Sequence, residues 1–337
     1  MREYFHSVAD AKFSFYQNRD DFKVFELAHK EFDGSGNFLI LEVQKIDLTT
    51  WEMVEIVASY LRIPPQKVGY AGLKDKHATT TQFISVQKMY EKEISRFSHP
   101  NISILQTFRD KNSLRLGDLG ANRFSINLYK VDNILAGRIQ KCATKILKYG
   151  LPNYFGYQRF GHDESSIAQA KELVAGELFV KDGKLKSFLY SIYQSELFNK
   201  WLLHRVLDSK AKGFETLELL RGDILAHSRH YNLEKSAKPM EICGLLCGRD
   251  LLRAKHEARE IERLYDDEFF AQKGSLRDAL VEPKDLQTKY FADQSVLNIS
   301  FTMPRGSYAT VFLESIAGKN YSAQMVKNKN HSAINSL

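Results

Sequence analysis

Strand-like alternation occurs near both ends of this 337-residue chain, and helical spacing occupies the middle. Apolar and polar residues alternate with period two over residues 38–45, 122–129 and 297–303, a pattern typical of half-buried β-strands. Residues 165–281 instead repeat their apolar side chains mainly at helical spacing. This distribution predicts an α+β fold. A mixed-sheet domain is built from both ends of the chain and is interrupted by an inserted, mainly helical domain.

Local signals predict individual elements of this fold. A hairpin is expected between the strands 22–27 and 38–45, because Asp33-Gly34-Ser35-Gly36 supplies turn residues between them. A helix is predicted over residues 49–62, since Thr49 and Glu52 have the spacing of a capping box. A helical pattern also covers residues 214–220.

Residues 69–82 form a loop between an apolar run and a β-prone run, and they carry the most unusual chemistry. Asp75 stands between Lys74 and Lys76. Nearby positive charge favours an ionised carboxylate, and such a carboxylate on a loop can act as nucleophile or base. On residue types alone a solvated turn is the more frequent interpretation, in roughly four cases of five. The loop lacks the G-K-[ST] ending of a phosphate-binding loop.

Composition narrows the classes of protein. Lys and Arg exceed Asp and Glu, 48 to 41, and a net charge of +7 suits an RNA partner. No apolar run approaches the roughly 18 residues of a membrane span, and residues 1–6 lack a signal-peptide core, so a cytoplasmic location is expected. The 3 cysteines argue against a disulfide framework. Cys243, Cys247 and His256 lack a fourth ligand at zinc-site spacing, so no metal is expected.

Four segments carry a family resemblance. Residues 71–82, Ala-Gly-Leu-Lys-Asp-Lys-His-Ala-Thr-Thr-Thr-Gln, closely resemble the signature of the TruD family of tRNA pseudouridine synthases. Residues 152–161, Pro-Asn-Tyr-Phe-Gly-Tyr-Gln-Arg-Phe-Gly, resemble the second hallmark of that family. Residues 114–124 and 303–310 match in order and spacing. The resemblance implies a discontinuous catalytic domain of residues 1–149 and 282–337, with a TruD-specific inserted domain over 150–281.

The resemblance also implies an activity and its site. The family isomerises uridine to pseudouridine, usually at position 13 of tRNA, without a cofactor. Asp75 matches the essential aspartate of the family. Phe124 matches the aromatic residue that packs against the flipped base, and Asn122 matches an asparagine that orients the aspartate. The implied partner is tRNA, and a monomer without an obligate protein partner is expected.

Further substrate contacts are predicted from the same comparison. Phe22 ends a segment similar to the P-E-D-F segment of the family, although Arg19 replaces the proline. Tyr16 stands where a lysine is common, which leaves open which cation pairs with the catalytic aspartate. Lys12, Lys74 and Lys76 are candidates for that pairing, and Lys74 and Lys76 are also predicted substrate contacts.

Two other functions compete with this one. The first is a non-catalytic RNA-binding or tRNA-chaperone module on the same fold, which has no chemical need for Asp75. The second is a nucleotide-binding enzyme that uses the loop 69–76 for phosphate, which the missing Walker ending disfavours. Turnover of uridine in tRNA separates a pseudouridine synthase from both of these alternatives.

Overall fold

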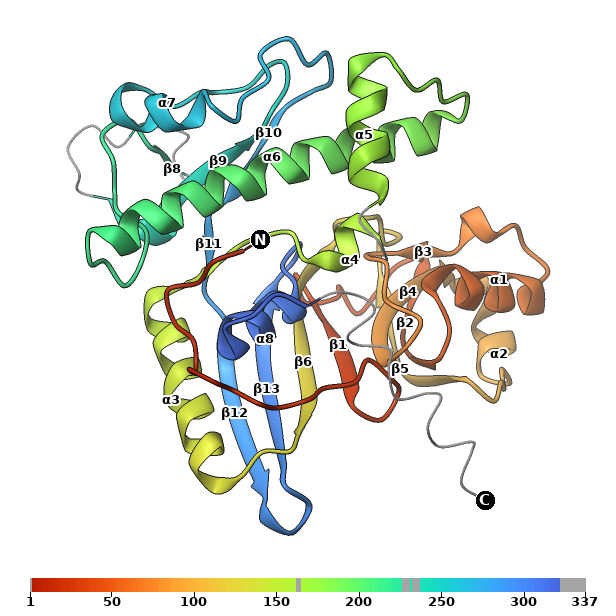
Figure 1. Cartoon of the computed structure of the whole chain (residues 1–337). Helices are drawn as coiled ribbons and strands as arrows, with labels where there is room; N and C mark the ends of the chain where they lie inside the picture. The colour runs from red at the N-terminus through yellow and green to blue at the C-terminus, as the bar shows by residue number, and fades with distance from the viewer. Residues whose placement is uncertain (1, 162–164, 226–230, 232–236, 322–337) are drawn as a thin grey trace. The chain divides into compact units, whose positions relative to one another are not determined.

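The computed structural model describes residues 2–161, 165–225, 231 and 237–321 (Figure 1). The chain divides into two compact units, and segments distant in the sequence build each of them. The sheet unit comprises residues 14–132 and 285–305, and the helical unit comprises residues 1–13, 133–284 and 306–337. The two units are defined by how compactly their residues pack. They do not test the predicted inserted domain over residues 150–281, which stays a prediction.

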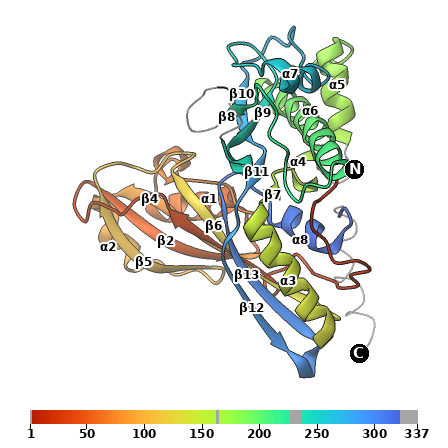
Figure 2. The ribbon, with the colours of Figure 1, turned by 90° about the vertical axis from the view of Figure 1, so that its left-hand side faces the viewer.

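An eight-stranded mixed sheet organises the sheet unit (Figure 1, Figure 2). Its strands are β1 (Phe22–Ala28), β2 (Phe38–Ile46), β3 (Gly69–Tyr70), β4 (Thr79–Gln87), β5 (Ile102–Asp110), β6 (Leu119–Tyr129), β12 (Lys284–Phe291) and β13 (Val296–Pro304). They lie in the order β12-β13-β6-β1-β4-β2-β5, and β3 pairs with β4. Strands β1 and β4 run parallel, whereas β6 is antiparallel to both β1 and β13. Strands from both ends of the chain thus share one mixed sheet, as predicted.

The predicted hairpin of β1 and β2 is wrong. Strand β4 lies between them, parallel to β1 and antiparallel to β2. Seven of the nine β4 residues are buried. A strand that buries both of its faces is stable only inside a sheet. Strand β4 therefore lies between β1 and β2, and these two strands do not pair directly as a hairpin.

The predicted helix over residues 49–62 is confirmed as α1 (Thr50–Leu61). The Thr49 hydroxyl accepts a hydrogen bond from the Glu52 amide at 3.1 Å, and the Glu52 carboxylate accepts one from the Thr49 amide at 2.6 Å. Both bonds satisfy amides that have no partner inside the helix. The apolar side of α1 packs on β2 and β4 with Val54 and Val57 in the core. The short helix α2 (Glu91–Ile94) precedes β5.

The helical unit is organised around its longest helix, α6, with α5 and β9 packed against it (Figure 1). Its helices are α3 (Asn133–Tyr149), α4 (Tyr157–Phe160), α5 (Ser165–Ala175), α6 (Gly183–Ala211), α7 (His256–Glu262) and α8 (Ala309–Ala317). Its strands are β7 (Leu151–Pro152), β8 (Ile224–Leu225), β9 (Ile242–Leu246), β10 (Ser275–Asp278) and β11 (Leu280–Val281).

The predicted helix over residues 214–220 is absent. Gly213, at φ +82°, turns the chain out of α6. The following segment buries Leu217 and Leu220 without a regular backbone ladder. The amide of Glu218 donates to the Ser209 hydroxyl at 2.9 Å. The helical spacing of the apolar residues therefore reflects two buried leucines in an extended segment.

Candidate active site

The loop that carries Asp75 joins β3 to β4 and is tied down through its backbone. The Lys74 amide donates to the Thr50 hydroxyl at 2.9 Å, and that hydroxyl donates to Gln82 Oε1 at 3.0 Å. Gln82 Nε2 donates in turn to the carbonyl oxygen of Gly72 at 3.4 Å. The first turn of α1 therefore holds the loop at Lys74, and strand β4 holds it at Gly72.

Lys45, on β2, anchors the backbone of Asp75 itself. Its ammonium group donates to the carbonyl oxygens of Asp75 at 3.0 Å and Leu48 at 2.5 Å, and the residue is 0% exposed. Burial lowers the pKa of Lys45 from 10.5 to about 8, against the attraction of Asp75, which raises it. At neutral pH a buried positive charge therefore lies beside Asp75.

The Asp75 side chain is exposed, and its Oδ2 accepts a hydrogen bond from Gln17 Nε2 at 3.3 Å. Gln17 directly follows Tyr16, which stands where a lysine is common in the family. An amide donor orients a carboxylate without neutralising it. The Lys45 ammonium places positive charge beneath the loop. The arrangement presents a carboxylate that a substrate arriving from solvent can reach.

The two lysines that flank Asp75 both have other carboxylate partners. Lys74 pairs with Glu26 at 2.5 Å, and their side chains are 6% and 1% exposed. Lys76 pairs with Glu52 at 2.7 Å on the surface. Hydrogen bonds from Lys76 and from the Thr49 amide lower the pKa of Glu52 to about 2. The buried pair fixes the loop to β1, whereas the exposed pair can exchange partners at little cost.

Strand register brings Lys45 and Phe124 onto one face of the sheet. Lys45 pairs with Thr80, Thr80 with Val24, Val24 with Phe124, and Phe124 with Phe301. Residues paired in register point to the same side. Adjacent strands lie about 4.8 Å apart, so about 14 Å separates the backbone of Lys45 from that of Phe124. The anchor of Asp75 and the predicted base-contacting ring thus occupy the same row.

Three phenylalanines form a cluster at one end of this row. The Phe124 ring centroid lies 6.2 Å from that of Phe22 and 5.7 Å from that of Phe301. Phe124 is 7% exposed and Phe22 is 2% exposed, so only ring edges reach solvent. Mutual packing supplies much of the burial, and the cluster holds Phe124 in a fixed orientation.

Asn122 lies two residues before Phe124 on β6, on the same face of the strand, and pairs with Glu26 of β1. Its Oδ1 is buried and has no hydrogen-bond partner among the described residues. The same is true of Thr80 Oγ1, in the row of Lys45 and Phe124. Buried polar atoms are normally paired. Of these two residues Asn122 is partly exposed, whereas Thr80 is 0% exposed.

The sequence did not identify Lys45, Glu26 or Gln17 as site residues, although strand alternation could have revealed the first two. Lys45 continues the inward alternation of β2 that includes Leu41 and Val43. Glu26 likewise follows the inward positions of β1. A charged residue at an inward position is rarely buried without a specific role or partner. Gln17 lies in an irregular segment, where no periodicity could reveal it.

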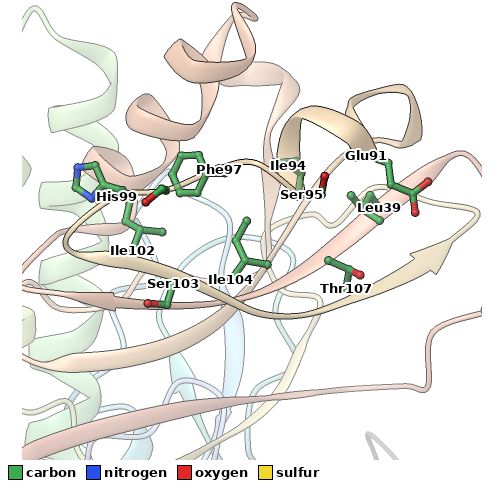
Figure 3. A pocket seen from close by; sticks show the side chains of 11 residues that line it. Leu39, Glu91, Ile94, Ser95, Phe97, His99, Ile102, Ser103, Ile104 and Thr107 are labelled. Carbon is green, nitrogen blue, oxygen red and sulfur yellow. The ribbon is translucent and has the colours of Figure 1, made fainter.

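A separate cavity of about 530 Å³ lies between β5 and the segment that includes α2 (Figure 3). Leu39, Ile94, Ile104 and His99 line it together with small hydroxyl side chains. Neither Asp75 nor Phe124 lines this cavity.

Within the described part of the chain, no group of three or more His, Cys, Asp or Glu residues could hold a metal ion. No helix there is long and apolar enough to cross a membrane.

Known proteins resemble this chain in both fold and sequence. The family model described as tRNA pseudouridine synthase D (TruD) matches residues 1–182 and 180–316. A solved structure from Methanosarcina mazei, described as a candidate tRNA pseudouridine synthase D, superposes with a TM-score of 0.72 at 21% identity. The superposition covers 94% of this chain and 96% of the Methanosarcina mazei chain, so the predicted α+β fold is confirmed.

Sequence relatives have the same family name. The tRNA pseudouridine synthase D of Sulfurimonas denitrificans is 37% identical, covering 93% of this chain and 96% of its own. That of Wolinella succinogenes is 34% identical, covering 94% and 98%. The chain belongs to the TruD family. The resemblance predicted from its four motifs is confirmed.

Proposed function

We propose that this chain isomerises uridine to pseudouridine in tRNA, at position 13, with Asp75 as the essential catalytic residue. Membership of the TruD family supports the reaction. The observation that carries the site assignment is the exposed Asp75 carboxylate on a loop whose backbone a buried lysine holds. A solvated surface turn has no need of such an anchor, because burying the Lys45 ammonium is costly.

The reaction rearranges one base and exchanges no electrons with a second reagent. The bond between ribose C1′ and uracil N1 breaks, the base turns, and a bond forms between C1′ and C5. The C5 proton leaves, and N1 gains a proton, so substrate and product have the same composition. Asp75 acts through its ionised carboxylate, which suits either attack or proton transfer at the reacting uridine. No cofactor is required by this balance.

The remaining site residues bind the target uridine, which must leave the RNA stack to be reached. Phe124 and Phe22 contribute ring edges against the flipped base. Asn122 offers its unpaired Oδ1 as an acceptor to an N–H group of the base, and its Nδ2 is the atom that can donate to the Asp75 carboxylate. Lys76 can exchange its exposed carboxylate partner for a phosphate. Lys74 remains a proposed substrate contact, and its buried partner Glu26 makes it also a support of the loop.

The test is Asp75→Asn, with Asp293→Asn as the matched control. Asn keeps the size of Asp75 and one acceptor oxygen for Gln17, but it removes the charge and nearly all of the nucleophilicity. Asp293 is an exposed carboxylate of the same unit. Pseudouridine formation in a tRNA transcript is measured beside tRNA binding and thermal melting. We expect Asp75→Asn to fold and bind but not to turn over, and Asp293→Asn to behave as the parent. Turnover of folded Asp75→Asn within a few-fold of the parent would refute the assignment.

The same measurements address the competing function. A non-catalytic RNA-binding module would bind tRNA but form no pseudouridine in the parent protein. Mapping the modified nucleotide in the product tests position 13 directly. We further propose a cytoplasmic monomer, and size-exclusion chromatography with light scattering tests the monomer.

A further inference from the structure

Two arginines of the helical unit approach the same aromatic ring. The guanidinium carbon of Arg277, on β10, lies 4.0 Å from the centroid of Phe155. That of Arg159, on α4, lies 5.6 Å from the same centroid. Arg159 and Phe155 belong to the hallmark segment 152–161, which the reaction at Asp75 does not use.

Neutral partners hold Arg277 in place. Its Nε donates to the carbonyl oxygen of Asn153 at 3.1 Å, and its Nη2 donates to Asn153 Oδ1 at 2.8 Å. Nη2 also donates to the carbonyl oxygen of Gly306 at 2.9 Å. Asn153 is itself fixed by donation to the Asp278 carbonyl oxygen at 2.9 Å. The guanidinium is therefore preorganised, and its Nη1 donates to no described residue.

Among the described residues, Arg159 is held by a hydrogen bond at one of its atoms. Its Nε donates to the Ser195 hydroxyl at 3.1 Å, and its guanidinium carbon lies 5.6 Å from the centroid of Phe188. Neither of its Nη atoms donates to a described residue. Arg159 is only partly exposed, so two donors are withdrawn from most solvent without a protein acceptor.

Neither guanidinium has a carboxylate partner within 4.0 Å among the described residues. By contrast, the buried Arg205 of α6 pairs with Asp223 at 2.6 Å. Burial lowers the pKa of Arg277 to about 10, and repulsion from Arg159 contributes in the same direction. Burial also lowers the pKa of Arg159. Attraction to Tyr308 and, for Arg277, to Asp278 opposes these shifts. Two partly buried positive charges with no carboxylate within 4.0 Å among the described residues still favour binding of an anion.

We propose that Arg159 and Arg277 bind one phosphodiester group of the tRNA backbone, with the Phe155 ring as an apolar support beside both guanidinium groups. This inference rests on the proposed function, because tRNA supplies the phosphate. A guanidinium that packs on a ring still presents N–H donors at its edge. Arg159 offers both of its Nη groups to phosphate oxygens, and Arg277 offers its Nη1. The hydrogen-bond partners of Arg277 among the described residues are carbonyl and amide groups, so none of them is a carboxylate that would compete with the phosphate.

Three variants test the site through tRNA binding across a salt series. Arg159→Gln removes one charge, and Arg277→Lys keeps the charge but loses the planar donor fork. Arg221→Gln is the matched control, since Arg221 is an exposed arginine of the same unit. Far-UV circular dichroism and melting establish which variants fold. Because Arg277 also has structural hydrogen bonds, Arg159→Gln decides the question if Arg277→Lys does not fold.

We expect Arg159→Gln to weaken tRNA binding roughly tenfold or more. The slope of log affinity against log salt should become shallower by about 0.7 to 0.9, the contribution of one phosphate. Arg277→Lys should weaken binding with a nearly unchanged slope. An unchanged affinity and slope in folded Arg159→Gln would overturn the proposal. So would an equal effect of Arg221→Gln, because general charge loss would then explain both.

A second arm distinguishes RNA from free phosphate. Inorganic phosphate is added to the parent and to Arg159→Gln while melting is followed. If phosphate stabilises only the parent while tRNA binding does not change in the variant, the site takes a free anion and the RNA assignment fails. A parent that forms pseudouridine while Arg159→Gln binds normally refutes this inference alone. A parent that neither binds nor modifies tRNA refutes the proposed function itself.

Discussion

Replacing Lys45 with methionine should change the pH dependence of stability in a way that only a buried, charged lysine explains. Methionine has a similar length and no charge. At neutral pH the exchange removes the cost of burying an ammonium, but it leaves the carbonyl oxygens of Asp75 and Leu48 without their donor. Each lost donor costs about 1–3 kcal/mol. The two effects offset each other, so we expect a net change within about 3 kcal/mol at pH 7.

The pKa of Lys45 gives the magnitude and the sign. Its value is 10.5 in an unfolded chain and about 8 in the folded protein, because burial disfavours the charged form. Between pH 8 and 10.5 the unfolded state therefore binds more protons than the folded state, and stability due to Lys45 rises with pH. One pKa unit corresponds to 1.36 kcal/mol, so the rise amounts to about 3 kcal/mol. Lys45→Met lacks this contribution.

Denaturant unfolding from pH 7 to pH 11 measures the effect as a difference between parent and variant. Other groups that titrate in this range cancel in the difference. Lys88→Met, at an exposed lysine of the same unit, is the control and should track the parent. The parent should gain about 3 kcal/mol relative to Lys45→Met across the window. A constant difference between the two proteins would show that Lys45 is not a buried cation.

Turnover gives a second readout for the same variant. Without its anchor the Asp75 backbone is free to shift, and a displacement of about 1 Å at a reacting group can cost about 100-fold in rate. We therefore expect Lys45→Met to fold, to bind tRNA and to form pseudouridine about 100-fold more slowly. A folded variant with the parental rate would remove Lys45 from the catalytic arrangement.

Three further variants separate packing from substrate contact. Phe124→Ala should lose about 3–5 kcal/mol of stability. Phe124→Leu should fold and lose activity if the ring edge packs against the base, a contact worth at most the roughly 1–3 kcal/mol of full stacking. A stable, fully active Phe124→Leu would reject that contact. Lys74→Met should destabilise by about 3–5 kcal/mol, because Glu26 is left buried without its ion-pair partner. The double variant with Glu26→Leu should recover stability, and its tRNA affinity relative to the parent reports whether Lys74 touches RNA. Lys76→Ala should change stability by at most about 1 kcal/mol yet make the salt slope of tRNA binding shallower by about 0.7 to 0.9; an unchanged slope would exclude a phosphate contact.

The sequence by itself determined the elements whose signals are local. The capping box of Thr49 and Glu52 fixed the start of α1, because both hydrogen bonds lie within one turn. Alternation along β6 identified which residues face inward, since side chains alternate along any strand. The motif around Asp75 identified the family and the candidate catalytic loop.

The tertiary structure decided which distant residues meet. The hairpin of β1 and β2 failed because strand pairing depends on burial across the whole sheet, and β4 with its two buried faces displaced the local partner. Lys45 lies 30 residues before Asp75, yet it anchors that residue through its carbonyl oxygen. The helical unit likewise brings Arg159 and Arg277 to one ring. Local propensity carries no information on such contacts, because their free energy comes from burying charges and rings that only the folded chain assembles.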